Sequence, residues 1–502
     1  MVLAVAVAPA LALTAAPSSA RDGRRDVATN PWADSRTPVL ARAAAALKGT
    51  GPRIDRVEAT LALRDLYVAR PDLNAAERED AGQLLARPTN GFSDSYGDGY
   101  LAPSSRACSK HMCLHRTRIG ADAPPGNAWA RTVLQMLERT WQHHVGKLGY
   151  RPPPSDGSRG GNGKFDVYLK ELGSQGVYGY CAPERTVAGK SRQASSFCVI
   201  DDDFSRDQFP GSPLDNLRVT AAHEFFHAIQ FGYDFQEDPW LLESTATWME
   251  ERFADRVNDN RQYLRFGQVA QPATSLDIFE SSGFVHYGNW PFWEYLSERF
   301  GVKIVRQIVE RAGTGRGLPN DFSIEATRRV LTKHGGFDRV FAEYAAGNAM
   351  PSKAYAEGRA FPVSKPAKTA KLSPARAGFT YAAKIDHLSS RTVKLSPGGS
   401  LPGRRWRLRL SVNAPSQQTH PAALVVVRPK RGKFVRQLIP LNGTGFGRAT
   451  IPFGARQVAT ATVTLVNAST RYRCATDTFF SCHGTPRDQD LRFALSARLT
   501  RG

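Results

Sequence analysis

The sequence predicts an α+β body, with a twisted sheet, backing helices and a helical second half, followed by an all-β sandwich at the carboxyl end. Strand-like and helix-like patterns alternate after residue 106, and helical periodicity dominates from residue 219 to residue 344. The last quarter instead shows β-branched strands separated by Gly, Pro and Asn turns. At 502 residues, the chain also exceeds what one hydrophobic core usually supports.

Residues 1–20 form an apolar run that ends in small residues, which predicts a signal peptide cleaved near Ala20. No Lys or Arg precedes this run, so either the start codon lies farther upstream or the run is only an Ala-rich disordered end. Six cysteines in three close pairs favour disulfides of an oxidising compartment, with reduced thiols as the alternative. We therefore expect a secreted, extracellular protein that is not transmembrane. The expected disulfides are Cys108–Cys113, Cys181–Cys198 and Cys474–Cys482.

Residues 21–105 predict a helical region at the amino end. Its first residues are polar, and apolar residues then recur at helical spacing to about residue 86. Pro71 interrupts this pattern, and Asn74 can cap the helix that follows. In an exported protein, such a segment is commonly a propeptide, and a helical pair packed permanently on the body is the equal alternative.

Residues 106–350 form the predicted α+β body, and residues 351–375, rich in Pro, Ala, Ser and Lys, predict a linker. Residues 127–150 predict one amphipathic helix, and residues 164–169 and 197–200 predict strands. Residues 376–502 predict the sandwich, with strands at 405–412, 422–427 and 459–466.

The net charge of +21 is concentrated at the carboxyl end. From residue 365 to residue 502 there are 24 Lys and Arg against 4 Asp and Glu, so this segment carries +20. The remainder holds 67 − 24 = 43 basic and 46 − 4 = 42 acidic residues, a net charge of +1. This pattern predicts a basic module that binds an anionic cell-wall or matrix polymer. Without a nucleic-acid motif, no specific binding to nucleic acid is expected.

The His-Glu-Phe-Phe-His string at residues 223–227 carries the strongest chemical signal. Residues i and i+4 share one face of a helix, so His223 and His227 can offer imidazole nitrogens to one zinc ion. Glu224 lies beside the first ligand, where its carboxylate can activate a zinc-bound water. By composition alone, the pattern occurs in roughly one chain in a hundred of this size.

A catalytic zinc site needs a third protein ligand and an open fourth position. The next helix is expected to begin at Pro239 and to fold back on the first helix, with Glu243 one turn inside it. Glu243 is the predicted third ligand, and Asp234 is the alternative because it is closer in sequence. Thr247 is expected to hydrogen-bond Glu243 or a zinc histidine, and Glu250 is expected on a solvated or helix-pairing face.

Together with Trp-Leu-Leu-Glu-Ser-Thr-Ala-Thr-Trp-Met-Glu at residues 240–250, the string resembles the gluzincin group of zinc metallopeptidases, to which thermolysin and the membrane-alanyl aminopeptidases belong. The Asp-Val-Tyr-Leu strand at 166–169 and the segment 287–301 are similar to those of exported bacterial metalloproteases. The resemblance covers about residues 108–349 and implies a zincin-like catalytic domain with Glu243 as the third ligand. The chain departs from this pattern at Ser244, usually Gly, at Thr247, often Asp, and in a shorter interval between His227 and Glu243.

Peptide hydrolysis also needs a donor for the developing oxyanion. Tyr287 is the preferred candidate from its place in the resembling segment, and His286 is the second. Residues 165–170 are expected to form an edge strand that pairs with an extended substrate. Calcium is a further candidate cofactor, at the acidic string 201–203 or in the loop of Asp94 and Asp98, although acidic turns without an ion are commoner.

Three functions remain open from the sequence. The first is a secreted zinc endopeptidase that acts on protein or peptide substrates through a metal-activated water. The second is a non-catalytic cell-surface or wall adhesion protein with a structural zinc site, against which Glu224 argues because a structural site has no need of it. The third is a zinc hydrolase that acts on a non-peptide bond.

Overall fold

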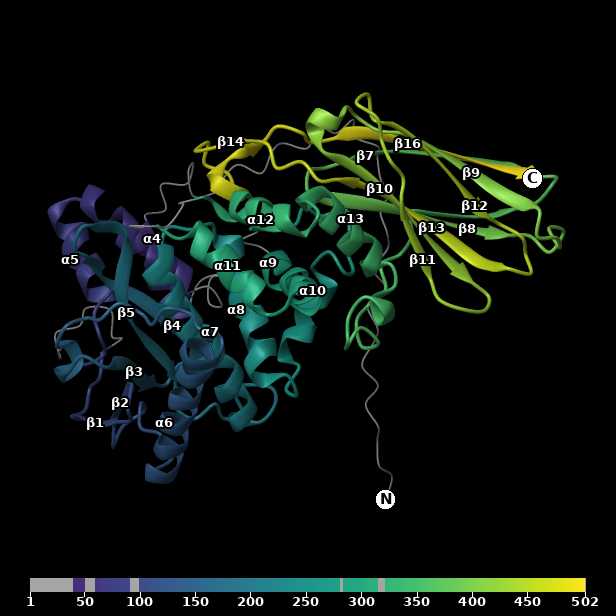
Figure 1. Ribbon diagram of the computed structural model, residues 1–502. Helices are drawn as coiled ribbons and strands as arrows, with labels where there is room; N and C mark the ends of the chain where they lie inside the picture. The colour runs from purple at the N-terminus through teal and green to yellow at the C-terminus, as the bar shows by residue number, and fades with distance from the viewer. Residues whose placement is uncertain (1–38, 50–58, 91–98, 280–282, 315–320, 502) are drawn as a thin grey trace, which may run out of the picture.

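The computed structural model describes residues 39–49, 59–90, 99–279, 283–314 and 321–501, and it combines a mixed α/β body with a β-rich carboxyl-terminal part (Figure 1). The predicted signal peptide, residues 1–20, and the loop of Asp94 and Asp98 lie outside the described residues. Within the described ranges, no helix is long and apolar enough to cross a membrane.

A five-stranded sheet lies at the centre of the α/β body, in the strand order β1-β2-β3-β5-β4. β2, β3 and β5 run parallel, whereas β1 and β4 pair antiparallel and form the two edges. The three parallel strands are largely buried, as expected for a sheet covered on both faces. The strands are β1 Ser104–Cys108, β2 Met112–Thr117, β3 Phe165–Lys170, β4 Gly179–Val187 and β5 Lys190–Asp201.

The expectation that residues 165–170 form an edge strand is wrong. β3 is paired on both sides, and all six of its residues are buried. Its charged residues are neutralised inside the protein, since the Asp166 carboxylate lies 2.6 Å from the Arg87 guanidinium and 2.7 Å from His115 Nε2. The edge strand next to the His-Glu-x-x-His helix is instead β4.

Helices surround this sheet and then form a second, helical half of the body, as predicted. α6 (Asn127–Trp141) continues as a π-helical stretch (Gln142–Lys147), which largely confirms the expected helix over 127–150. The remaining helices are α7 Pro213–Asp234, α8 Pro239–Ala254, α9 Val285–Gly288, α10 Trp290–Phe300, α11 Lys303–Ala312, α12 Ser323–Leu331 and α13 Phe337–Asn348, with a 3₁₀ segment at Asp259–Arg265.

Three helices of the amino-terminal region pack together against the sheet, with α4 next to β4 (Figure 1). They are α2 Val39–Lys48, α4 Ala59–Ala69 and α5 Ala75–Leu84. The predicted cap is confirmed, because the Asn74 side chain accepts a hydrogen bond from the Glu77 N–H at 3.0 Å and the Glu77 carboxylate accepts from the Asn74 N–H at 2.9 Å. Buried Arg87, just after α5, donates to the Glu184 carboxylate of β4 at 2.7 Å. The helices are therefore packed on the body. Both predicted alternatives, a propeptide and a permanently packed helical pair, agree with this packing.

The β-rich part contains two sheets that share one apolar core. The five-stranded sheet has the order β11-β10-β13-β8-β6, and the four-stranded sheet has the order β12-β9-β16-β7. β6 lies within residues 351–375, so the last part of the predicted linker is a strand of the sandwich. The strands are β6 Lys368–Leu372, β7 Gly378–Ile385, β8 Ser389–Pro397, β9 Trp406–Asn413, β10 Pro421–Pro429, β11 Val435–Leu438, β12 Phe446–Pro452, β13 Val458–Asn467 and β16 Leu491–Arg501, with a small pair β14 Tyr472–Arg473 and β15 Thr485–Pro486.

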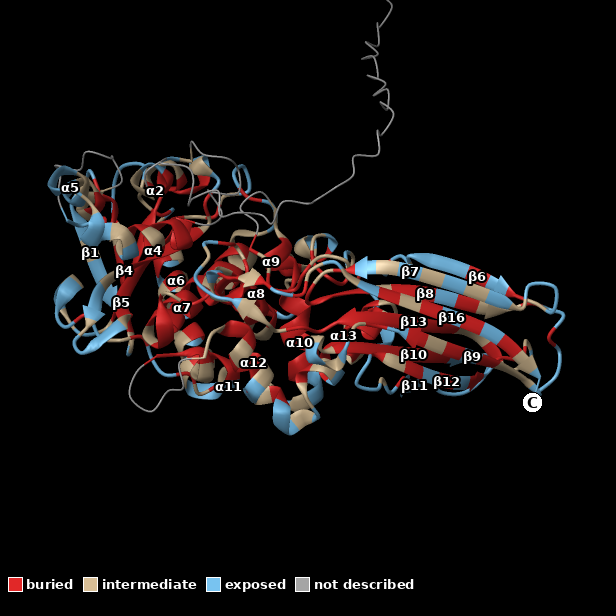
Figure 2. Ribbon diagram, turned by 90° about the horizontal axis from the view of Figure 1, so that it is seen from above, coloured by how far each residue is buried: buried red, intermediate tan, exposed pale blue. Residues whose placement is uncertain are grey.

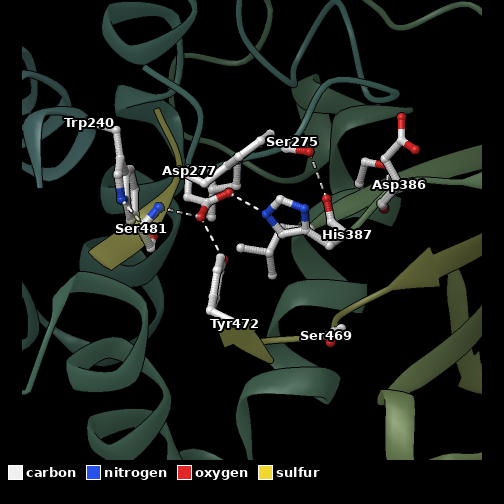
Figure 3. A network of polar contacts seen from close by, with 12 residues as sticks. Trp240, Ser275, Asp277, Asp386, His387, Ser469, Tyr472 and Ser481 are labelled. Carbon is white, nitrogen blue, oxygen red and sulfur yellow. Dashed lines mark hydrogen bonds and ion pairs between the residues drawn. The ribbon is translucent and has the colours of Figure 1, made fainter. Parts of the chain in front are cut away.

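A buried polar network joins the two parts, centred on Asp277 in the loop before α9 (Figure 3). Its carboxylate lies 2.7 Å from His387 Nε2 and accepts hydrogen bonds from the Tyr472 hydroxyl at 2.6 Å and the Ser481 N–H at 3.1 Å. Trp240 of α8 donates its indole N–H to Ser481 Oγ at 3.0 Å. The β-rich part is therefore fixed to the body by buried side chains as well as by the chain itself.

All three expected disulfides are present. Cys108–Cys113 joins β1 to β2, Cys181–Cys198 joins β4 to β5, and Cys474–Cys482 closes the loop that reaches the junction. Such bonds persist in oxidising compartments.

Candidate metal centre

The helix with the His-Glu-x-x-His string, α7, is held by an apolar face. The Ser212 side chain caps it by accepting from the Asp215 N–H, and Pro213 occupies its first turn. Phe225 and Phe226 are 2% and 0% exposed and anchor α7 in the main core. His223 and His227 are each two positions from Phe225, so they lie on the opposite side of α7 from this anchor, toward α8, which packs on α7.

The two histidines converge on Glu243 of α8. His223 Nε2 lies 3.3 Å from one carboxylate oxygen of Glu243, and His227 Nε2 lies 3.5 Å from the other. Ligand atoms around a tetrahedral zinc ion, at bond lengths of about 2.0–2.2 Å, are roughly 3.3–3.5 Å apart. The donor set and its spacing therefore fit a tetrahedral zinc ion.

Hydrogen-bond partners orient both imidazole rings. His223 Nδ1 lies 2.7 Å from the Glu250 carboxylate, and His227 Nδ1 lies 2.8 Å from Gln230 Oε1. Because both partners accept, each Nδ1 carries a proton, which leaves each Nε2 as the ring atom available to a metal ion. Burial raises the pKa of Glu243, but the opposing effect of His227 and His223 is larger. The net result is a pKa below the usual range of a glutamate, so this carboxylate is ionised.

Glu224 lies beside the cluster with a partner from the amino-terminal region. Its Oε2 accepts a hydrogen bond from the Thr60 hydroxyl of α4 at 3.1 Å, and the same hydroxyl accepts from the Cys181 N–H of β4 at 3.0 Å. Both side chains are buried, with 4% of Thr60 and 7% of Glu224 exposed. Burial raises the pKa of Glu224, and His223 and His227 partly offset this rise.

An open pocket reaches His223 and Glu224 from the protein surface. Tyr287 lines this pocket, and its ring centroid lies 6.1 Å from that of His223. His286 is fully buried and packs on Phe279 with ring centroids 4.4 Å apart. Burial lowers the pKa of His286 to about 3, with Glu243 acting weakly in the opposite direction. The other lining residues are Tyr178, Gly179, Val219, Thr220, Glu250, Asp259 and Tyr263.

Several residues considered from the sequence have other roles. Asp234 pairs with Arg192 at 3.0 Å and is not part of the cluster. Thr247 donates to the backbone carbonyl of Glu243 at 2.9 Å, one turn back along its own helix. Of the two alternatives for Glu250, the solvated face is wrong, because the residue is buried. The helix-pairing face is confirmed, because Glu250 of α8 contacts His223 of α7.

The sequence analysis missed three residues of the site: Glu250, Gln230 and Thr60. Gln230 follows His227 by three positions, a helical neighbour that its spacing could have indicated. Glu250 lies two helical turns after Glu243, so it was accessible to the same reasoning. Thr60 belongs to a separate segment, and nothing in its sequence context indicates a contact with Glu224.

A second group of carboxylates lies where β3 and β5 end. Glu171, Asp201 and Asp202 each offer an oxygen within 4.8 Å of the others. Both oxygens of Asp201 accept backbone N–H groups, including those of Gly173 and Phe204. Asp202 is 3% exposed, and its Oδ1 is buried without a hydrogen-bond partner. Burial, together with Asp201 and other acidic neighbours, raises the pKa of Asp202 to about 8.

No protein-family model and no curated protein matches the chain. Among solved structures, the chain is similar over 26% of its length to PliG of Salmonella Typhimurium, a periplasmic inhibitor of g-type lysozyme, with 98% of that chain covered, 9% identity and a TM-score of 0.16. It is similar over 58% of its length to the family GH115 4-O-methyl-α-glucuronidase BtGH115A, with 38% of that chain covered, 8% identity and a TM-score of 0.14. Scores this low carry no argument about function.

Proposed function

We propose that this chain is a secreted zinc endopeptidase of the gluzincin type, with a zincin-like catalytic domain. The observation that supports it best is the convergence of His223 Nε2, His227 Nε2 and the Glu243 carboxylate at tetrahedral spacing. Glu224 lies beside this convergence, and an open pocket gives a substrate access to it.

Zinc bound by these three residues would polarise a peptide carbonyl and acidify a water molecule. Glu224 accepts the proton of the attacking water and then delivers it to the leaving amine, as a buried carboxylate with a raised pKa is suited to do. Tyr287 lines the pocket and donates its hydroxyl to the developing oxyanion, while His286 packs behind it as a positioning residue.

The edge strand β4 supplies the second element of substrate binding in this proposal. Gly179 of β4 lines the pocket together with Glu224. The Cys181 N–H of β4 already donates to the Thr60 hydroxyl, so an extended peptide would pair with the β4 backbone at Gly179. This pairing would carry the scissile bond toward the proposed metal centre. β4 therefore takes the role that the sequence analysis gave to residues 165–170.

The proposal is tested by measuring zinc stoichiometry and casein hydrolysis on three proteins. They are the wild type, Glu243→Ala and Glu224→Gln. We expect one zinc per chain in the wild type, loss of both zinc and activity in Glu243→Ala, and retained zinc without activity in Glu224→Gln. Zinc retained by Glu243→Ala, or proteolysis retained by Glu224→Gln, would contradict the assignment. Zinc without any proteolysis in the wild type would favour the adhesion protein with a structural site.

A further inference from the structure

The four-stranded sheet of the β-rich part has an exposed outer face. The opposite sheet packs on α13, where Ala346 contacts Leu424 and Val426 of β10. Along β9, β12 and β16, buried residues alternate with exposed or half-buried ones, and along β7 half-buried residues alternate with exposed ones (Figure 2). This alternation places one set of side chains in the shared core and the other set on the outer face.

The outer face is strongly basic. Its six charged positions are all Lys or Arg, and β7, β9, β12 and β16 contain no Asp or Glu. Within the part of the chain that the structure describes, none of the six forms an ion pair with a carboxylate. The charge is therefore available to an external anion. The six residues are Lys384, Arg407, Arg409, Arg448, Arg492 and Arg498.

Two pairs of these cations lie directly opposite each other on neighbouring strands. Arg409 of β9 faces Arg498 of β16, and Lys384 of β7 faces Arg492 of β16. Like charges directly opposite in an antiparallel pair destabilise a sheet. Such pairs therefore do not stabilise the fold. They would, however, bind a ligand that carries repeated negative charges.

A depression lies on the same face between the two cationic pairs, with a volume of about 710 Å³ that includes space open to solvent. Small side chains form its floor, and Phe446 lies on one side with the Arg448 guanidinium 4.8 Å from its ring centroid. From residue 492 to residue 498 the strand rises by roughly 20 Å, so the pairs are separated by several monomers of an extended polymer. The floor residues are Thr380, Ala382, Ser411, Ala494 and Ser496.

We propose that this face binds an extended acidic polysaccharide. Carboxylate or phosphate groups of the polymer would bind the Arg409–Arg498 and Lys384–Arg492 pairs, because guanidinium groups bind both anions in a bidentate manner. The neutral parts of its sugar rings would lie on the small, hydroxyl-bearing floor against Phe446. Two aromatic residues line the depression, but Tyr381 packs against the core of the β-rich part, so Phe446 remains as the one stacking platform. One platform favours a glycan over single-stranded nucleic acid, which needs a row of stacking platforms.

Affinity electrophoresis of the full chain in the Glu224→Gln background tests this site independently of peptidase activity. The probes are polygalacturonate, which carries carboxylates, a phosphate-bearing teichoic acid, neutral dextran and single-stranded DNA. Stronger binding to polygalacturonate or to teichoic acid will show whether the face prefers carboxylate or phosphate groups. We expect the double variant Arg409→Ser/Arg498→Ser to weaken acidic-glycan binding by about tenfold and to reduce its salt dependence, since two counterion-releasing contacts are lost.

Matched variants separate the site from net charge. Lys430→Ser/Lys433→Ser removes two exposed cations from the loop between β10 and β11, away from the face, and we expect binding within about twofold of the parent. Ala494→Trp fills the depression without a change in charge and should abolish binding. Arg409→Ser/Arg498→Ser should not lower the Tm, because it removes a like-charge pair.

Three results would overturn the inference. Equal losses in the two double variants would show that only total charge matters. Binding to dextran as strong as to the acidic glycans would make the cations irrelevant. Stronger binding to single-stranded DNA than to either acidic glycan at equal charge would assign the face to nucleic acid.

Discussion

Thr60 offers the sharpest test of how the amino-terminal helices relate to the metal centre. Its hydroxyl donates to Glu224 Oε2 and accepts from the Cys181 N–H, so it links α4, the edge strand β4 and the proposed catalytic carboxylate. In a permanently packed helix, Thr60 positions Glu224 for the reaction. In a propeptide, the same contact is lost when the segment is removed.

The perturbation is Thr60→Val, which keeps the branched shape and removes the hydroxyl. A hydrogen bond to a charged group is worth about 1.5–3 kcal/mol, and a loss felt only in the transition state lowers kcat by roughly 10- to 150-fold. Glu224 borders the open pocket, where water can replace part of the lost bond. We therefore expect kcat to fall by about tenfold, the lower end of this range. Thr60→Ser retains the hydroxyl and should stay close to the wild type.

The assay is steady-state hydrolysis of a quenched fluorescent peptide, with zinc content and the amino-terminal sequence of the secreted enzyme determined on the same preparation. We expect kcat to fall in Thr60→Val while zinc content stays at the wild-type value, because Thr60 does not belong to the group of three residues proposed to bind zinc. The reasoning is refuted if an enzyme that retains residues 59–69 loses less than twofold in kcat. A mature chain that begins after residue 105 would establish the propeptide instead.

Three further predictions concern stability. Asp277→Ala should lower the free energy of unfolding by about 3–5 kcal/mol in a urea titration, because it leaves His387 and the Ser481 N–H unsatisfied in the junction; a loss below 1 kcal/mol would contradict this. Cys181→Ala/Cys198→Ala should cost about 3 kcal/mol for a crosslink that spans 17 positions, and an unchanged Tm would contradict it. Without calcium, stability should fall as pH rises from about 4 to 8, since burial raises the pKa of Asp202 to about 8 and the folded state holds that proton longer. The measurement is Tm as a function of pH, and either added calcium or Asp202→Asn should remove the loss of stability with rising pH. If the loss persists in Asp202→Asn, another titrating group causes it.

The sequence predicted those parts of the molecule that depend on local periodicity. The helical spacing of His223 and His227 and the turn before Pro239 were sufficient to bring Glu243 into the cluster. The capping box at Asn74 and the three disulfides were also accessible, because each involves residues close together in the chain. The β-rich carboxyl end followed from β-branched alternation and turn residues.

Features that depend on contacts between distant segments of the chain could not be predicted from the sequence. Residues 165–170 were expected at a sheet edge from the resemblance to zincins, but their place inside the sheet depends on pairing with β2 and β5. The Asp166 carboxylate is bound there by Arg87 and His115, which come from other segments. The basic outer face shows the same limit. Net charge could be counted from the sequence, but the pairing of Arg409 with Arg498 depends on a register between strands far apart in the chain.

The junction determines how the two proposed sites would work together. Ser481, from the disulfide-closed loop of the β-rich part, bonds Trp240, which precedes Glu243 by three residues on α8. Ser481 also donates its N–H to Asp277, so the β-rich part is held both to the loop before α9 and to the helix that carries the proposed third metal ligand. A flexible tether would let the catalytic centre sample a volume around a bound polymer, whereas a buried network fixes its direction. An enzyme anchored through the four-stranded sheet would therefore cleave proteins at a fixed distance from the glycan, and Asp277→Ala should widen the set of cleaved sites without weakening glycan binding.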